Sequence, residues 1–209
     1  MNCKAIYDTL YREYGTQHWW PARTRDEVVI GAVLTQNTSW ANVEKAIANL
    51  YTAGLCEIHK IRELDLVVLA EYIRPAGYFN VKAKRLKNVC TQIQTELLKN
   101  AELHIARESL LAINGVGKET ADSILLYAFD RAIFVIDAYT TRIFGRLGLA
   151  LKDYDAYQDF FMSNLKHDVT IFNEYHALIV WHGKHFCKTK PLCDKCCLSK
   201  HCETKGISK

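Results

Sequence analysis

Apolar residues recur at helical spacing through nearly the whole chain, and this periodicity constrains the fold more than any other feature. Thr24-Arg25-Asp26-Glu27 fits the capping box that opens a helix. The one β-like run, Ile133 to Ile136, is too short to build a sheet. With 3 prolines and 10 glycines in 209 residues, turns are also too few for an all-β chain. The sequence therefore predicts an all-α protein. Helices are expected at about 24–34, 43–50, 61–73, 86–97, 107–112, 118–129, 138–147, 153–165 and 170–184.

Hydropathy argues against a membrane-spanning or secreted protein, and the positive charge is concentrated in one segment. No apolar run approaches the roughly 18 residues of a membrane span, and the first residues lack the apolar core of a signal peptide. The net charge of +4 is modest, but the segment 181–209 holds seven lysines against only Asp194 and Glu203. The same segment contains five of the eight cysteines. We expect no membrane association and a reducing, cytoplasmic location, where clustered cysteines are more often metal ligands than disulfides.

The basic tail contains a compact cysteine pattern, C-x5-C-x2-C-x5-C. Its members are Cys187, Cys193, Cys196 and Cys202. Four thiolates this close predict a [4Fe–4S] cluster or a tetrahedral zinc. Zinc ribbons usually carry two C-x2-C knuckles far apart, so the single knuckle here favours the iron–sulfur cluster. Cys197 is a spare that could exchange with a ligand. Lys188 and Lys190 lie between the first two ligands, where they either contact phosphates or offset thiolate charge.

Gly115-Val116-Gly117 separates two short predicted helices. Glycine permits positive φ and close backbone approach, and the exposed N–H groups of such a turn, with the next helix N-terminus, bind phosphate without reading bases. An ordinary αα-hairpin is the simpler interpretation. The flanking apolar spacing favours a helix-hairpin-helix motif at about 108–128. The residues that show this spacing are Ile113, Ala121, Ile124 and Leu125.

Asp137 follows Gly117 by twenty residues and directly precedes a predicted helix. By itself it reads as an N-cap worth about 1 kcal/mol. Together with the hairpin and the four-cysteine tail, it resembles the endonuclease III branch of the helix-hairpin-helix DNA glycosylases over nearly the whole chain. That resemblance makes Asp137 the catalytic aspartate. It also implies a two-lobed fold, with a helical barrel domain at 21–130 and an iron–sulfur cluster domain formed by 1–20 plus 131–209.

The resemblance also implies DNA contacts. Gln36 falls in a segment similar to the family's glutamine loop, and Gly77 to Ala83 is similar to the segment that wedges into the duplex. The partner implied is double-stranded DNA containing a damaged base, bound by a monomeric, nucleoid-associated prokaryotic enzyme. The implied contact residues are Gln36, Tyr78, Phe79, Lys82, Gly115, Val116, Gly117, Lys118, Lys188 and Lys190.

Two positions depart from the family pattern. Bifunctional members carry a nucleophilic lysine at the second residue after Gly-Val-Gly, where this chain has Glu119. Lys118 is one residue away and therefore rotated by roughly 100° on a helix. The resemblance thus predicts a monofunctional enzyme in which water attacks the sugar and no strand is cut. The first cysteine spacer is also one residue shorter than the family's common six.

The tryptophans indicate which base leaves. Trp19-Trp20-Pro21 and Trp40, with Glu119, look like the 3-methyladenine DNA glycosylase III subgroup. The resemblance implies that Trp20, Pro21 and Trp40, together with Trp19, form the pocket for the flipped base, although any one tryptophan could simply pack in a core. An N3-alkylated adenine is cationic, so an aromatic pocket holds it by cation–π contact.

These features predict a monofunctional DNA glycosylase for alkylated purines in base excision repair. One alternative is a bifunctional endonuclease III-type glycosylase/lyase for oxidised pyrimidines that recruits Lys118. An alternative of another class is a non-catalytic DNA-binding module that uses only the hairpin and the basic tail, and this would not need Asp137.

Overall fold

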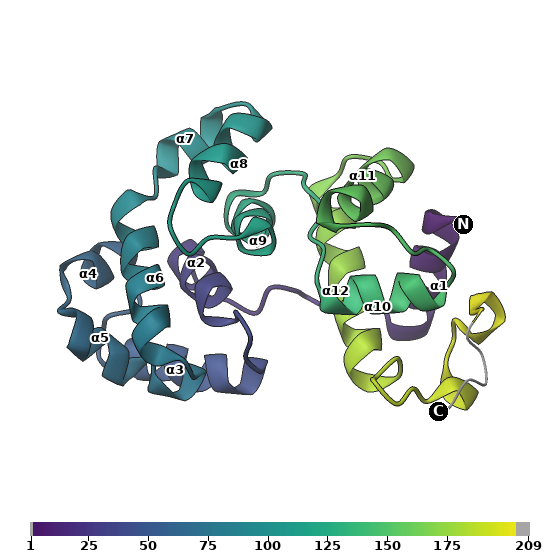
Figure 1. Ribbon diagram of the computed structural model, residues 1–209, viewed down its shortest axis with the longest axis horizontal. Coiled ribbons are helices and arrows are strands. Elements are labelled where there is room, and N and C mark those ends of the chain that lie inside the picture. Colours follow the sequence, from purple (N-terminus) through teal and green to yellow (C-terminus); the bar gives the residue numbers. More distant parts are fainter. Residues whose placement is uncertain (1, 204–209) are drawn as a thin grey trace. The chain divides into compact units, whose positions relative to one another are not determined.

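The computed structural model describes residues 2–203 and is all-helical, with no β-strand among them (Figure 1). The all-α expectation is therefore confirmed. Two compact units divide the chain: Ala22–Arg131 forms one, and Met1–Pro21 with Ala132–Lys209 forms the other. None of the helices in the described part of the chain is long and apolar enough to cross a membrane.

The unit Ala22–Arg131 is built around the buried helix α2, which packs against α9, α6 and α3. Its elements are α2 (Arg25–Leu34), α3 (Trp40–Thr52), α4 (Ile58–Glu63), α5 (Leu66–Tyr72), η1 (Arg74–Ala76), α6 (Phe79–Gln92), α7 (Thr95–Asn100), α8 (Leu103–Leu111) and α9 (Lys118–Phe129). Residues Val28 to Leu34 are all buried, because α2 is covered by neighbouring helices rather than lying on one side of a layer.

Helix α2 begins where the capping box predicts. The Thr24 hydroxyl accepts a hydrogen bond from Glu27 N at 3.1 Å. The Glu27 carboxylate in turn accepts bonds from Arg23 N at 2.8 Å and from the Tyr51 hydroxyl at 2.7 Å. The cap thereby satisfies helix N–H groups and also fixes α2 to the side chain of Tyr51 on α3.

Two expected helices are divided in the structure, and one observed helix was not expected. The expected helix 61–73 is two helices, because Asp65 caps α5 by accepting bonds from Val67 N at 2.8 Å and Val68 N at 3.3 Å. The expected helix 86–97 divides into α6 and α7 at the extended residue Ile93. Helix α1 (Cys3–Tyr14) was not predicted.

An ion pair joins α8 to α9 in this unit. The Arg107 guanidinium donates to both carboxylate oxygens of Asp122, at 2.7 and 3.1 Å, and the Asp122 side chain is fully buried. Because its partner neutralises it and makes two parallel bonds, this buried carboxylate fixes how the two helices of the hairpin pack.

The second unit has an aromatic core. Its elements are α1 (Cys3–Tyr14), α10 (Ala138–Arg146), α11 (Tyr154–Asn164), α12 (Val169–His185), η2 (Cys193–Lys195) and η3 (Ser199–His201). Phe134 stacks on Phe161 with ring centroids 4.1 Å apart, and the edges of Phe172 and Tyr175 meet them. Helix α12 packs against both α1 and α10.

Candidate active site and DNA-contact loops

The carboxylate of Asp137 lies at the N-terminus of α10. Its Oδ1 accepts hydrogen bonds from Thr140 N at 2.7 Å and from the Thr140 hydroxyl at 2.8 Å. The side chain is 11% exposed, so it keeps access to solvent while one oxygen is fixed. Asp137 is thus a helix cap, and its second oxygen is not used in capping.

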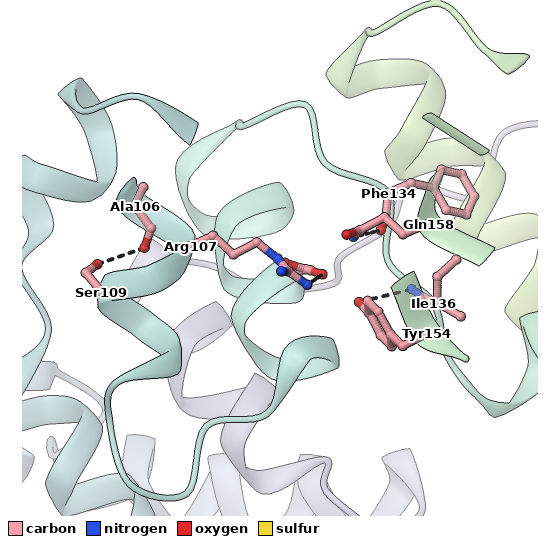
Figure 2. A network of polar contacts seen from close by, with 8 residues as sticks. Ala106, Arg107, Ser109, Phe134, Ile136, Tyr154 and Gln158 are labelled. Atoms are coloured by element: carbon pink, nitrogen blue, oxygen red, sulfur yellow. Dashed lines mark hydrogen bonds and ion pairs between the residues drawn. The ribbon is translucent and has the colours of Figure 1, made fainter. Parts of the chain in front are cut away.

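The segment leading to Asp137 is fixed by side chains from α11. The Gln158 amide donates to Phe134 O at 2.7 Å, and Ile136 N donates to the Tyr154 hydroxyl at 3.4 Å (Figure 2). Phe134 itself is anchored in the aromatic core. These contacts immobilise the extended backbone just before α10, so the position of Asp137 is set from both sides.

His176 of α12 faces the other oxygen of Asp137. Its Nε2 atom lies 3.7 Å from Asp137 Oδ2, and its side chain is only 7% exposed. Burial lowers the pKa of His176; the Asp137 carboxylate acts in the opposite direction, and Lys184 lowers it further. Sequence analysis missed this residue, because a lone histidine within an apolar helix carries no signal that distinguishes it from a core side chain.

The predicted base-pocket residues fall on both units. Trp19 and Trp20 are half-buried with ring centroids 5.4 Å apart, Pro21 is exposed, and the Lys184 ammonium lies 5.7 Å from the Trp19 ring centroid. Trp40 is half-buried at the start of α3. Glu119 belongs to the other unit as well, at the exposed second position of α9.

The Gly-Val-Gly turn is held by side chains from two other elements. Gly115 has φ +97°, and the side chain of Arg85 lies directly against it. Gln36 donates to Gly115 O and to the Thr120 hydroxyl, each at 3.0 Å, and accepts from Arg85 Nη1 at 2.7 Å. Gln36 was predicted as a DNA contact, and the structure shows its amide engaged within the protein.

The rest of the hairpin matches the predicted motif in position. Val116 is buried, with its N–H donating to Ile113 O at 3.0 Å, and Gly117 is the exposed N-cap of α9. Lys118 and Glu119 are the first residues of α9, so their side chains diverge by about 100°. The N-terminus of this 12-residue helix therefore follows directly on the glycine turn.

The predicted wedge segment presents one aromatic ring to solvent. Tyr78 is 74% exposed and adopts the left-handed conformation, with φ 46°. Phe79 is half-buried as the first residue of α6, with the Arg74 guanidinium 5.5 Å from its ring centroid. Tyr78 is thus the most exposed large apolar side chain of this segment, ahead of Val81 at 49%.

The prediction that Lys82 contacts DNA is wrong. Its side chain is 2% exposed, and its ammonium donates to Leu34 O and Ala76 O, each at 2.8 Å. Burial, and secondarily the charge of Arg85, lowers the pKa of Lys82 to about 8. The lysine therefore joins the end of α2 to η1 from inside the unit, where phosphates do not reach it.

Both ends of the cysteine tail contact Arg146, the last residue of α10. Arg146 Nη1 lies 3.2 Å from Cys187 Sγ and donates to Lys188 O at 2.7 Å, and Cys202 Sγ lies 3.3 Å from Arg146 O. Lys188 and Lys190 are exposed. The first and last cysteines of the pattern, Cys187 and Cys202, thus both lie against Arg146.

The remaining thiols have different neighbours. Cys196 Sγ lies 3.5 Å from His182 Nε2, and Cys197 Sγ lies 3.5 Å from the Tyr14 hydroxyl. Burial raises the pKa of Cys196 to about 11, with the nearby thiols of Cys197, Cys187 and Cys202 acting in the same direction. The donor set and its clustering fit a thiolate-bound group. Within residues 2–203, however, no three Cys, His, Asp or Glu side chains are already arranged as metal ligands.

Comparisons with known proteins show the family. The family model for HhH-GPD superfamily base excision DNA repair proteins matches residues 30–166. The chain belongs to this superfamily. A relative from Methanocaldococcus jannaschii, provisionally named a DNA repair glycosylase, is 54% identical over 96% of this chain and 95% of its own. The chain is thus a base excision DNA glycosylase of the HhH-GPD superfamily, and its resemblance to the endonuclease III-like members is confirmed.

Two further proteins that are similar to this chain carry different names. The endonuclease III of Sulfolobus acidocaldarius is 32% identical over 84% of this chain and 80% of its own. The structure of H. pylori 3-methyladenine DNA glycosylase bound to 1,N6-ethenoadenine superimposes with a TM-score of 0.76 and 30% identity. That likeness covers 88% of this chain and 98% of the other.

Proposed function

We propose that this chain is a monofunctional DNA glycosylase that hydrolyses the N-glycosidic bond of alkylated purines of the 3-methyladenine type. Two observations together carry the proposal: Asp137 is capped and keeps solvent access, and the sequence has Glu119 at the position where a lyase carries its lysine. The likeness to the H. pylori 3-methyladenine glycosylase supports the substrate class.

Asp137 stabilises the sugar during the reaction. The bond between sugar C1′ and purine N9 breaks, and its electron pair leaves with the cationic base, which becomes neutral. The sugar becomes positively charged, and the Asp137 carboxylate stabilises that charge. A water oxygen bonds to C1′, and the water's proton passes through the carboxylate to solvent. The products are the free base and an abasic site in an uncut strand.

The aromatic residues bind the flipped base. We assign binding of the flipped base to Trp19, Trp20, Pro21 and Trp40, together with Glu119. A cation–π contact is worth up to about 2 kcal/mol when desolvated, and stacking adds about 1–3 kcal/mol per base. Together these offset the few kcal/mol needed to extrude a nucleotide. A cationic base is a good leaving group, so a single carboxylate is sufficient.

The DNA contacts come from exposed residues and backbone N–H groups. Tyr78 and Phe79 act at the duplex, and Gly115 to Lys118 bind a phosphate through the turn and the start of α9. Lys188 and Lys190 are exposed and contact phosphates. The enzyme acts as a monomer on nucleoid DNA, with a barrel domain at 21–130 and a cluster domain made of the remaining residues.

The tail holds a [4Fe–4S] cluster in this proposal, with zinc as the alternative. Its ligands are Cys187, Cys193, Cys196 and Cys202. When bound, the cluster supplies a structural link that holds the tail against α10 and α12. Purified protein with an absorbance band at about 400 nm and stoichiometric iron supports this assignment. A colourless protein that contains zinc contradicts it.

The decisive experiment is base release from duplexes that each carry a single lesion. We expect release from methylated-purine DNA, and none from oxidised-pyrimidine DNA. Asp137→Asn keeps the cap, because Asn also caps helices, and should reduce turnover by at least about 100-fold while sparing duplex binding. Asp153→Asn is the matched control: Asp153 caps α11 through Ala156 N at 2.9 Å, and this variant should keep full activity. Absence of release from methylated-purine DNA contradicts the substrate class.

The second candidate is a bifunctional glycosylase/lyase for oxidised pyrimidines. The similarity to the Sulfolobus endonuclease III favours it, with Lys118 as the amine. Borohydride would then trap a covalent protein–DNA adduct, and Lys118→Met would abolish it. A non-catalytic DNA-binding module, the third alternative, would release no base from either substrate and would be indifferent to Asp137→Asn.

A further inference from the structure

We propose that His176 is a positioning residue for Asp137, whose neutral imidazole donates an Nε2–H hydrogen bond to Asp137 Oδ2 during the reaction. This inference rests on the proposed role of Asp137. It adds a second group to the site, contributed by α12 rather than by α10 and its N-terminal turn.

The two oxygens of Asp137 have separate neighbours, and this division carries the argument. Oδ1 receives both donors of Thr140, from the backbone and the hydroxyl. Oδ2 faces His176 Nε2 at 3.7 Å. This distance is longer than a hydrogen bond, and a shift of less than about 1 Å closes it. Catalytic hydrogen bonds are commonly long before substrate binds and tighten in the complex.

The environment of His176 selects the neutral form of the ring. The side chain is 7% exposed, and desolvation by burial lowers its pKa. The charged groups that act on it are Asp137 of α10, which opposes this effect, and Lys184 of α12, which reinforces it. A charged imidazolium would offset the negative charge of the Asp137 carboxylate, and that charge is what stabilises the positive sugar. A neutral ring orients Oδ2 and leaves that charge intact.

Rate measurements distinguish this role from a packing role. His176→Phe keeps a buried ring but removes the donor, and His176→Gln supplies an amide N–H that reaches a similar place. We expect the single-turnover rate of base release to fall at least ~10-fold in His176→Phe, about 1.4 kcal/mol, and to stay within ~3-fold of wild type in His176→Gln. Duplex affinity should change less than ~2-fold in both variants. His185→Phe, an exposed histidine on the same helix, is the matched control.

Equal rates in wild type and His176→Phe overturn the proposal. A folded His176→Gln that is as slow as His176→Phe also overturns it, because restoring the donor would then have no effect. The rates of both variants are compared with the wild-type rate on the same lesion. Their outcome therefore does not depend on which lesion the enzyme removes.

A spectroscopic measurement tests the proposal without activity. Long-range ¹⁵N–¹H spectra, assigned by comparison with His176→Gln, should show a neutral ring with the proton on Nε2, and Asp137→Asn should shift that nitrogen's resonance. A ring protonated only on Nδ1, or a charged ring at neutral pH, overturns the proposal. If the wild-type protein releases no base from any duplex, the proposed function fails, and this spectrum alone decides the role of His176.

Discussion

Replacing the buried Lys82 with methionine should change how stability depends on pH. Lys82 is 2% exposed, and burial lowers its pKa to about 8, against an ordinary value of 10.5. In the unfolded chain the amine keeps its proton up to the higher value. Between pH 8 and 10.5 the unfolded state therefore binds more protons than the folded state, and the stability contributed by this group rises with pH.

The size of the effect follows from the shift. Each pKa unit corresponds to about 1.4 kcal/mol, so burial of the Lys82 charge costs about 3 kcal/mol below pH 8, and this cost disappears by about pH 10.5. The bonds to Leu34 O and Ala76 O survive deprotonation, because a neutral amine still has two N–H groups. Deprotonation thus removes the penalty without removing the link between α2 and η1.

Urea unfolding at pH 7, 8, 9 and 10 measures this directly. We expect the free energy of unfolding of wild type, minus that of Lys82→Met, to increase by about 2.5 kcal/mol across this range, because the last part of the penalty disappears only above pH 10. Taking the difference cancels every other group that titrates in both proteins. Lys84→Met, at an exposed lysine on the same helix, removes a charge without burial and serves as the control. A difference for Lys82→Met that stays constant with pH refutes the reasoning.

The remaining predictions concern the hairpin. Gly115→Ala places a Cβ against the Arg85 side chain at φ +97° and should lower the free energy of unfolding, measured in urea, by about 1–3 kcal/mol. The control Gly117→Ala, whose Cβ meets nothing within 4 Å, should cost under about 1 kcal/mol. Equal costs for the two variants would contradict the packing argument. Asp122→Asn leaves the Arg107 charge without its carboxylate and should lower the free energy of unfolding by about 3–5 kcal/mol. An Asp122→Leu/Arg107→Met double variant should recover part of that loss. An Asp122→Asn protein as stable as wild type would contradict the role given to this ion pair.

Helix starts were predicted where a local capping signal was used. Thr24 and Glu27 locate the start of α2, and Gly117 locates the start of α9. The single helix expected at 61–73 was wrong although the sequence contains the signal for a break, because Asp65 is an ordinary N-cap residue placed before an apolar run. Periodicity alone continues across such a cap, because two short helices can share one apolar phase.

The candidate site was predictable only in part, for a different reason. Asp137 has a sequence context that marks it, whereas His176 comes close to it only through the packing of α12 against α10. Lys82 was predicted to contact DNA because it falls in the segment similar to the family's duplex wedge. Only tertiary structure shows that its ammonium points to two backbone carbonyls.

The basic residues of α6 serve the protein's own loops more than an outside partner. Lys82 holds the end of α2 and η1, Arg85 holds Gln36 and covers Gly115, and Lys87 donates to Leu64 O. Three of the four cations near the start of this helix are thus bonded internally. In the proposed function, DNA contacts on this unit therefore come mainly from backbone N–H groups at the glycine turn and from the exposed Tyr78 ring. Such contacts would depend on how the loops are held, so we expect the buried Lys82 and the Arg85 stem to affect DNA binding through these loops and without touching DNA.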